Sequence, residues 1–253
     1  MPCCHDHNMT TKKNLFQTLA RLGQRDLQPE LMDQPQLDPL EHALALLGLA
    51  RVNWFSRSDA IFWPTLRSFA LEQKGGPLRV LDVACGGGDV TCALAKRARR
   101  AGLDVKIAGC DLSDIALSVA RKQAASSGET IEFFQHDVLS EPLPARFDVV
   151  ICSLFLHHLD EAEAVAVLRS MSQAARRAVL VNDLVRSRSG YLLAVFGTRL
   201  LSRSRIVHID GPLSVAGAFT PDEALQLCEQ AGLNGATVSR HWPQRFLLTW
   251  SRS

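Results

Sequence analysis

Short apolar runs alternate with amphipathic segments along the chain from about residue 78 onward. The runs predict buried strands, and the longer segments, in which apolar residues recur at helical spacing, predict helices. The strands are expected near residues 79–84, 105–110, 131–135, 147–152 and 177–182, and the helices between them near 89–101, 114–127 and 161–173. Such alternation is typical of a parallel sheet with helices on both faces. The pattern therefore predicts an α/β fold.

Both ends of the chain depart from this alternation. Over residues 38–69 the apolar positions follow a helical period without strands, which predicts two helices ahead of the sheet. A last helix is expected to begin after Thr220 and to end at Gly232. Two final strands are expected near 235–240 and 245–251.

One segment between the fifth strand and the last helix is apolar on nearly all sides. It runs from Tyr191 to Leu201 and is followed by a basic stretch. We interpret it as part of a helical insertion near residues 186–218, which is either a further core helix or a lid over a pocket for an apolar substrate. The expected organisation is then a flexible tail and arm at 1–37, a helical cap at 38–75 and the main domain at 76–253.

The composition narrows the class of protein. A chain of 253 residues with 47% hydrophobic content can bury one large core, and a formal net charge of +2 gives no general attraction to nucleic acid or to an anionic membrane. No apolar stretch is long enough to span a membrane, and no apolar signal core stands at the N-terminus. We therefore expect a cytoplasmic protein without a nucleic-acid partner, and the sequence leaves a homodimer open.

Seven cysteines are an odd number, and five of them lie inside the apolar strand and helix patterns, which favours reduced, buried thiols. The other two, Cys3 and Cys4, stand beside His5, Asp6 and His7. These five residues are potential metal ligands, but structural zinc normally takes its ligands from two separated pairs. We interpret the cluster as part of a disordered tail and expect no metal site.

The strongest chemical signal is the segment from Arg79 to Asp89, an apolar run that ends in three consecutive glycines and continues as a helical pattern. Glycine lets the backbone approach a ligand closely, and the start of the following helix presents unpaired N–H groups. Asp111 stands at the end of the next predicted strand, where a carboxylate can accept hydrogen bonds from a ribose. Together these features predict a nucleotide site.

The glycine spacing distinguishes between nucleotides. A dinucleotide site would have a third glycine three residues after the second, and Asp89 occupies that position. The spacing of Ala84, Gly86 and Gly88 after Asp82 instead resembles the first motif of class I S-adenosylmethionine-dependent methyltransferases. The resemblance covers the main domain. It implies a Rossmann-like, seven-stranded, mostly parallel sheet with a reversed C-terminal hairpin, plus the N-terminal helices.

The resemblance also implies the cofactor, S-adenosylmethionine, and the residues that hold it. Asp82 would lie near the ammonium group of the methionine part, and Asp111 would accept hydrogen bonds from the ribose. The full set of expected cofactor-binding residues is Asp82, Ala84, Gly86, Gly88, Asp111, Leu112, Asp137, Val138 and Ser153. Ala84 replaces a usual glycine. We expect it in an ordinary β conformation, because positive φ costs an alanine about 1 kcal/mol or more.

The loop after the fourth strand, at residues 152–159, would lie beside the methyl group in this fold. Its Leu-His-His-Leu turn resembles that of small-molecule methyltransferases of the quinone and polyketide biosynthesis type. It lacks the motifs of the DNA amino-methylating, protein-arginine and metal-dependent catechol enzymes. In the small-molecule group the N-terminal helices close over the cofactor and acceptor, so Arg51, Asn53 and Trp54 are expected to face the site.

A hydroxylated acceptor needs a base, and neutral imidazole is well suited to that task at neutral pH. The candidates are His157, His158, Asp183 and His208, and their spacing does not separate them. The sequence therefore predicts metal-independent O-methylation of a small, largely apolar acceptor, a phenol or polyketide-like compound. C-methylation of a quinone precursor, a nicotinamide-dependent oxidoreductase and a non-catalytic cofactor-binding subunit are the alternatives.

Overall fold

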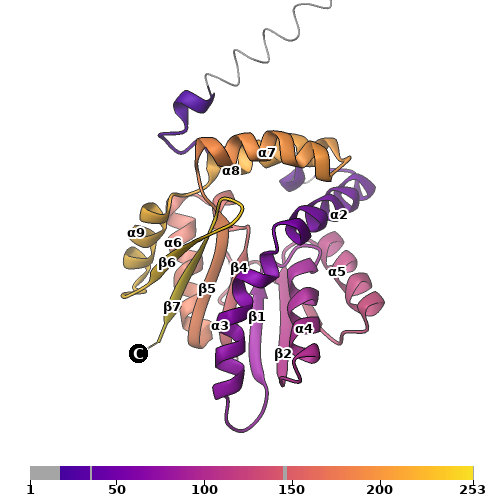
Figure 1. Cartoon of the computed structure of the whole chain (residues 1–253), viewed down its shortest axis with the longest axis vertical. Helices are drawn as coiled ribbons and strands as arrows, with labels where there is room; N and C mark the ends of the chain where they lie inside the picture. Colours follow the sequence, from indigo (N-terminus) through magenta and orange to yellow (C-terminus); the bar gives the residue numbers. More distant parts are fainter. Residues whose placement is uncertain (1–17, 35, 145–146, 253) are drawn as a thin grey trace, which may run out of the picture.

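The computed structural model describes residues 18–34, 36–144 and 147–252. Its strands form one sheet in the order β3-β2-β1-β4-β5-β7-β6, and helices cover both faces (Figure 1). The strands are β1 (Leu78–Val83), β2 (Val105–Asp111), β3 (Glu132–Gln135), β4 (Phe147–Ser153), β5 (Ala175–Leu184), β6 (Thr237–His241) and β7 (Arg245–Ser251). Strands β1 to β5 run parallel, whereas β7 is antiparallel to both β5 and β6. The predicted mostly parallel sheet with a reversed C-terminal hairpin is confirmed.

Two layers of helices bury the faces of the sheet, close to the positions that the sequence predicted. They are α3 (Ser58–Glu72), α4 (Asp89–Arg100) and α5 (Asp114–Ser127) on one side and α6 (Glu161–Ala174) and α9 (Pro221–Ala231) on the other. Phe62 of α3 and Leu94 of α4 pack in one apolar cluster with the central strands. Leu168 of α6 and Leu227 of α9 pack in the other. Both faces of the sheet are therefore buried.

Local hydrogen bonds explain where the second layer of helices begins and ends. Asp160 and Glu163 form a reciprocal capping box at the start of α6, and Thr220 and Glu223 do the same at the start of α9. Gly232 ends α9 in the left-handed conformation that glycine adopts without strain. These are the helix boundaries that the sequence predicted.

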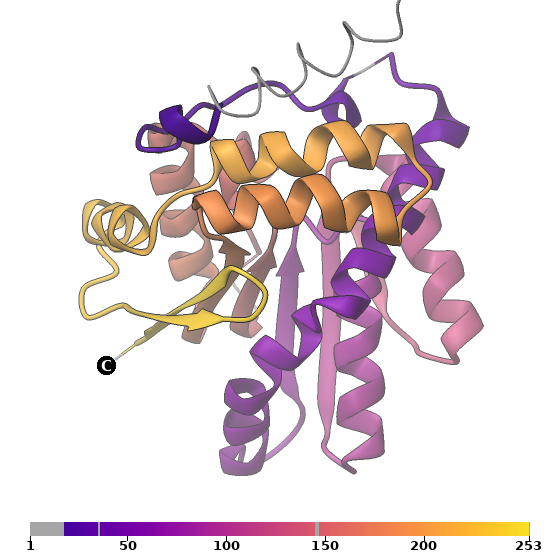
Figure 2. The same ribbon diagram turned by 45° about the horizontal axis from the view of Figure 1, so that its top comes forward.

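Three helices lie across the carboxyl ends of the strands. They are α2 (Pro39–Phe55), which precedes α3, and α7 (Arg188–Leu201) and α8 (Arg205–Gly217), which form the predicted insertion. Figure 2 shows α7 and α8 side by side over this end of the sheet. Within α7 only Gly190 and Thr198 are buried. The segment is therefore an outer covering helix and not the further core helix that its apolar sequence allowed.

The backbone at Ala84 differs from the prediction. Its φ is 53°, in the left-handed region, and not in the β region. The chain turns sharply here, because Cys85 N donates to the Cys110 carbonyl and Gly86 N donates to the Asp111 carboxylate. Both bonds hold the turn against the end of β2. They stabilise a conformation that costs an L-residue about 1 kcal/mol or more.

Two further expectations concern the thiols and the membrane. The cysteines within the described residues are all unpaired and buried, which confirms reduced thiols there. The Cys3 to His7 cluster lies outside the described residues. Across the described part of the chain, no helix has the length and apolar character needed to cross a membrane.

Candidate active site

A cavity of about 530 Å³ lies at the carboxyl ends of β1, β2 and β4. The strand order reverses between β1 and β4, and ligands of doubly wound sheets bind at this kind of reversal. Helix α2 covers the cavity and contributes His42, Leu46 and Asn53 to its wall. We call this space the first cavity.

The floor of the first cavity is the turn between β1 and α4. Gly86 and Gly88 have φ of 53° and 73°, which favour glycine. A Cβ on Gly88 would stand 2.8 Å from the Cβ of Ala120, so the packing of α5 also requires glycine there. A Cβ on Gly86 would meet only the Leu46 side chain, at 3.8 Å, because that position faces the cavity. Because Gly86 has no side chain, a ligand in the first cavity can approach the backbone of the turn closely.

Asp82 is buried at the end of β1 and lines the first cavity. Its Oδ2 accepts a hydrogen bond of 2.6 Å from Thr91 Oγ1, while its Oδ1 is buried and has no partner among the described residues. Burial raises the pKa of Asp82 to about 7. An unpartnered buried acceptor is costly, so this oxygen fits a ligand that brings a donor, such as the ammonium group of the expected cofactor.

Asp111 joins the turn to the next helix. Its Oδ2 accepts from Gly86 N at 2.8 Å and its Oδ1 accepts from Ser113 N at 2.9 Å. Ser113, and not Asp111, caps α5. Burial raises the pKa of Asp111, and the two N–H donors oppose that shift. The remaining lone pairs of this fixed carboxylate can accept hydrogen bonds from a diol.

The other expected cofactor residues also lie on the wall of the first cavity. These are Ala84, Leu112, Asp137, Val138 and Ser153. The Asp137 carboxylate already accepts from Leu139 N at 3.0 Å and from Ser140 Oγ at 2.6 Å, which holds its own turn. Ser153 Oγ accepts from Asn182 Nδ2 at 3.0 Å. The structure thus brings the expected set together around one space, except for Gly88, which packs against α5 and does not line the cavity. Gly87, which was not in the expected set, does line it.

A second cavity, of about 170 Å³, lies between the sheet end and α7 and α8. It shares Met32, Leu49, Leu154 and His158 with the wall of the first cavity, so the two spaces meet. Its remaining surface is mostly apolar and includes aliphatic side chains of α2, α7 and α8. A small apolar molecule in this cavity would therefore lie against a ligand in the first one.

A buried histidine and aspartate pair stands at this junction. His157, in the short helix η2 (Leu156–His158), lines the second cavity, and its Nδ1 lies 2.6 Å from Asp183 Oδ1. Burial alone would raise the pKa of Asp183, but His157 outweighs it and holds that pKa below its ordinary value. Because the carboxylate can only accept, Nδ1 carries the proton and Nε2 is left as the basic nitrogen.

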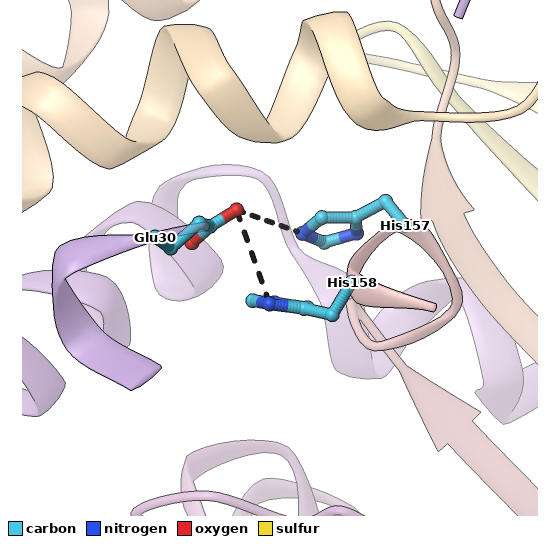
Figure 3. A group of neighbouring side chains, drawn as sticks. All are labelled: Glu30, His157 and His158. Carbon is cyan, nitrogen blue, oxygen red and sulfur yellow. Dashed lines mark ion pairs between the residues drawn. The ribbon is translucent and has the colours of Figure 1, made fainter. Parts of the chain in front are cut away.

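Glu30 faces both histidines from a neighbouring segment (Figure 3). Its Oε1 lies 3.8 Å from His157 Nε2 and 4.0 Å from His158 Nδ1, which is too far for a hydrogen bond. His158 Nδ1 instead pairs with Asp33 Oδ2 at 2.9 Å. Burial alone would lower the pKa of His158, but Asp33 and Glu30 outweigh it and raise that pKa to about 9. His158 is therefore a cation at neutral pH.

The segment that supplies these acids is the arm, residues 25–34, which includes the short helix η1 (Leu31–Asp33). The Asp210 carboxylate of α8 accepts from Leu31 N and Met32 N at 2.9 and 3.0 Å. Ser214 Oγ donates to Glu30 Oε1 at 2.6 Å. The predicted tail and arm therefore includes a segment fixed over the junction. The partners of its acids could not be predicted locally, because they are more than 100 residues away.

Glu30, His157 and His158 each offer one ligand atom, and these atoms lie within 4.8 Å of one another. A divalent cation would have to draw them closer together and turn His158 away from Asp33. The expectation that the protein has no metal site stays a prediction.

Three expected site residues lie elsewhere. His208 lines neither cavity, and its Nε2 lies 2.7 Å from the Ser202 carbonyl oxygen, so it is not placed to act as the base. Trp54 is 80% exposed and Arg51 is exposed on the outer side of α2. Of the three α2 residues that were expected to face the site, only Asn53 does so. The helical period of the apolar residues predicted helix α2, but it did not predict which face of that helix is buried.

Comparison with known proteins agrees with this geometry. Residues 80–178 match a family described as a methyltransferase domain. The chain is 30% identical over 177 residues to a ubiquinone biosynthesis O-methyltransferase of Leptothrix cholodnii, covering 67% of this chain and 71% of that protein.

Two solved structures have the same fold. An O-methyltransferase family 2 protein of Planctomyces limnophilus, in complex with apigenin, aligns with a TM-score of 0.58 at 17% identity, over 87% of this chain and 63% of that one. The magnesium protoporphyrin IX methyltransferase of Synechocystis, with bound SAH, the product that S-adenosylmethionine leaves after methyl transfer, has the second of these structures. It aligns with a TM-score of 0.54 at 15% identity, over 94% of each chain. With the turn, the two carboxylates and the sheet order described above, these matches show that the chain belongs to the class I S-adenosylmethionine-dependent methyltransferases.

Proposed function

We propose that the enzyme methylates a hydroxyl group of a small, largely apolar acceptor, a phenol or polyketide-like compound, with His157 as the general base. The observation that supports this most strongly is the position of the His157–Asp183 pair. His157 lines the apolar second cavity with its Nδ1 held by Asp183, and the adjacent His158 lines both cavities.

The first cavity holds the cofactor in this proposal. When bound there, S-adenosylmethionine supplies an electrophilic methyl group. Asp82 Oδ1 accepts from its ammonium group, the turn at Gly86 lets its methionine part approach the backbone, and Asp111 accepts from its ribose hydroxyls. Asp137 and Val138 border the adenine, and Leu112 and Ser153 complete the wall. These residues fix the position of the reacting group relative to the second cavity, which supplies proximity and orientation.

The second cavity holds the acceptor and contains the groups that remove its hydroxyl proton. Asp183 holds the Nδ1–H of His157, which directs the Nε2 lone pair toward the acceptor hydroxyl. His157 takes the hydroxyl proton as the oxygen becomes a nucleophile, and Asp183 stabilises the imidazolium that forms. His158, cationic at neutral pH, lines both cavities and favours the developing phenolate.

The covering elements keep water away from this step. Helices α2, α7 and α8 and the arm close over the junction, and the wall that they form is mainly aliphatic. In such an environment the charges at His157 and His158 act more strongly than in water. The second cavity also argues against a non-catalytic cofactor-binding subunit, because that alternative requires no acceptor space.

A product analysis tests the proposal. The purified enzyme is incubated with methyl-labelled cofactor and pairs of small phenols and their O-methyl ethers, and the products are identified by NMR. Label transfer to an oxygen of the free phenols, and none to the blocked ethers, is the expected result. Label on a ring carbon would support C-methylation of a quinone precursor instead. Cofactor binding without transfer to any phenol would refute the proposal.

A further inference from the structure

A buried arginine on the wall of the second cavity forms no ion pair with an acid among the residues that the structure describes. Arg245 begins β7, is 2% exposed and lines that cavity. Its Nη1 donates to Ser58 Oγ at 2.9 Å and its Nη2 donates to Asn53 Oδ1 at 3.2 Å. Its Nε is buried without a partner among the described residues. A guanidinium has five N–H groups, so most of its donors are unused.

The nearest carboxylates do not neutralise this cation by contact. Asp89 and Asp183 act on Arg245 through space, and neither forms an ion pair with it within the described part of the chain. Asp183 is committed to His157. Burial lowers the pKa of Arg245 to about 10, so the side chain remains charged at neutral pH. Asp183 and Asp89 therefore compensate the charge only from a distance, while the direct contacts of the guanidinium are neutral and its Nε–H lacks an acceptor within the described residues.

Arg186 shows how this chain pairs a buried arginine that has a structural task. It is 6% exposed, and its Nη1 and Nη2 donate to the two carboxylate oxygens of Glu223 at 2.8 and 2.6 Å. Its Nη1 and Nε also donate to the carbonyls of Ala218 and Leu22. Arg186 lines neither cavity. Within the described ranges, Arg245 at the second cavity lacks the kind of acidic partner that Arg186 has.

We propose that Arg245 is the anion subsite of the acceptor cavity and that the acceptor carries a carboxylate besides the hydroxyl group. This inference rests on the proposed function for the identity of the second cavity. A planar carboxylate matches the fork of a guanidinium and can accept two of its unused N–H groups. The acceptor would place its hydroxyl at His157 and its carboxylate at Arg245, since both side chains line the same cavity.

Binding of an isosteric pair of probes tests this assignment without methyl transfer. The full-length protein is saturated with SAH, and its affinities for 2-naphthoate and for the neutral 2-naphthamide are measured by calorimetry. The wild type is expected to bind the carboxylate at least about tenfold more tightly than the amide. Arg245→Met should abolish this preference, while Arg245→Lys, which keeps the charge but loses the fork, should keep part of it.

Controls separate this effect from damage to the fold. Arg240→Met removes an exposed arginine of the neighbouring strand β6 and should leave the preference as in the wild type. Affinity for SAH is measured in every variant and the probes are added at saturating SAH, because Arg245 donates to Asn53 on the wall of the first cavity. Affinity for SAH in Arg240→Met should stay within about twofold of the wild type. Equal binding of the two probes by the wild type, no naphthoate binding, or a preference that survives Arg245→Met would each overturn the assignment.

The two proposals fail in different ways. Methylation of phenols by an enzyme that shows no preference for carboxylates would refute the role of Arg245 and support O-methylation. A carboxylate preference that depends on Arg245, in an enzyme that methylates no hydroxyl group, would support the subsite and refute O-methylation.

Discussion

The two cavities are built in different ways. In the first, the turn glycine and the two carboxylates expected to hold the cofactor come from the ends of β1 and β2, between Asp82 and Asp111, while α2 and the loops after β3 and β4 complete the wall. The second takes its polar groups from the arm, the loop after β4 and the start of β7, which span Glu30 to Arg245. A ligand common to a whole family can be held by a local motif. A particular acceptor is selected by side chains that only the folded chain brings together.

The largest expected effect is on the rate of methyl transfer when the general base of the second cavity is removed. His157→Ala should lower the rate of methyl transfer by about 10²–10⁴-fold, because it removes the proton acceptor, and should leave affinity for SAH unchanged. Initial rates with labelled cofactor and calorimetry with SAH measure the two quantities. His208→Ala is the matched control, since that imidazole lines neither cavity and should keep the wild-type rate. A His157→Ala enzyme with more than half the wild-type rate would place the base elsewhere.

Removing Asp111 from the first cavity should instead act on cofactor affinity. Asp111→Ala should weaken cofactor binding by more than about 1.5 kcal/mol, because it removes a charged acceptor and frees the Gly86 and Ser113 N–H groups. Calorimetry with SAH measures the loss. Asp114→Ala, at the exposed start of α5, removes the same charge three residues away and should have little effect. Unchanged affinity in Asp111→Ala would exclude the carboxylate from the ribose site.

The same contrast explains what the sequence could predict. The sheet, its helices and the turn follow from periodicity and glycine spacing, which act over a few residues. All of the expected cofactor set except Gly88 therefore lines one cavity. Of the base candidates, the sequence could not separate His157 from His208, because the decisive feature is a contact with Asp183, 26 residues further along the chain. Glu30 lies in an arm that loosely resembles the small-molecule enzymes, but nothing there indicated its contacts with the histidines, and Arg245 had no local pattern. Ala84 was placed in the wrong conformation because hydrogen bonds from β2 override its own preference.

The folding stability of the protein without cofactor should depend on pH through the titration of Asp82. Its pKa of about 7 in the folded state exceeds its ordinary value of 3.8, so the folded state binds the proton more tightly. The stability from this group is full at acidic pH and is lost as the pH rises through about 7. Melting temperatures across this range measure the slope. Asp82→Asn should flatten it and should also weaken SAH binding, since an amide is a poorer partner for an ammonium group. A slope that persists in Asp82→Asn would assign it to another residue.

Cofactor binding should show the opposite dependence on pH. The ammonium group needs the ionised carboxylate, so affinity for SAH should fall as the pH drops below about 7. Calorimetry at several pH values measures this fall. The second cavity offers a contrast, because the neighbouring His158 keeps its proton up to about pH 9. An SAH affinity that is constant across the neutral range would show that Asp82 is already ionised in the free enzyme.

The smallest expected effect concerns the turn itself. Ala84 has a φ of 53°, so Ala84→Gly should relieve the strain that an L-residue meets there. The gain is reduced because glycine also makes the unfolded chain more flexible, and the net stabilisation should be about 0.5–1 kcal/mol. Urea unfolding measures it, with Ala101→Gly as a control at a position of negative φ, where the same change should destabilise. If Ala84→Gly destabilised the protein as Ala101→Gly does, the left-handed turn would be wrong, and with it the close approach of backbone to cofactor that distinguishes the first cavity from the second.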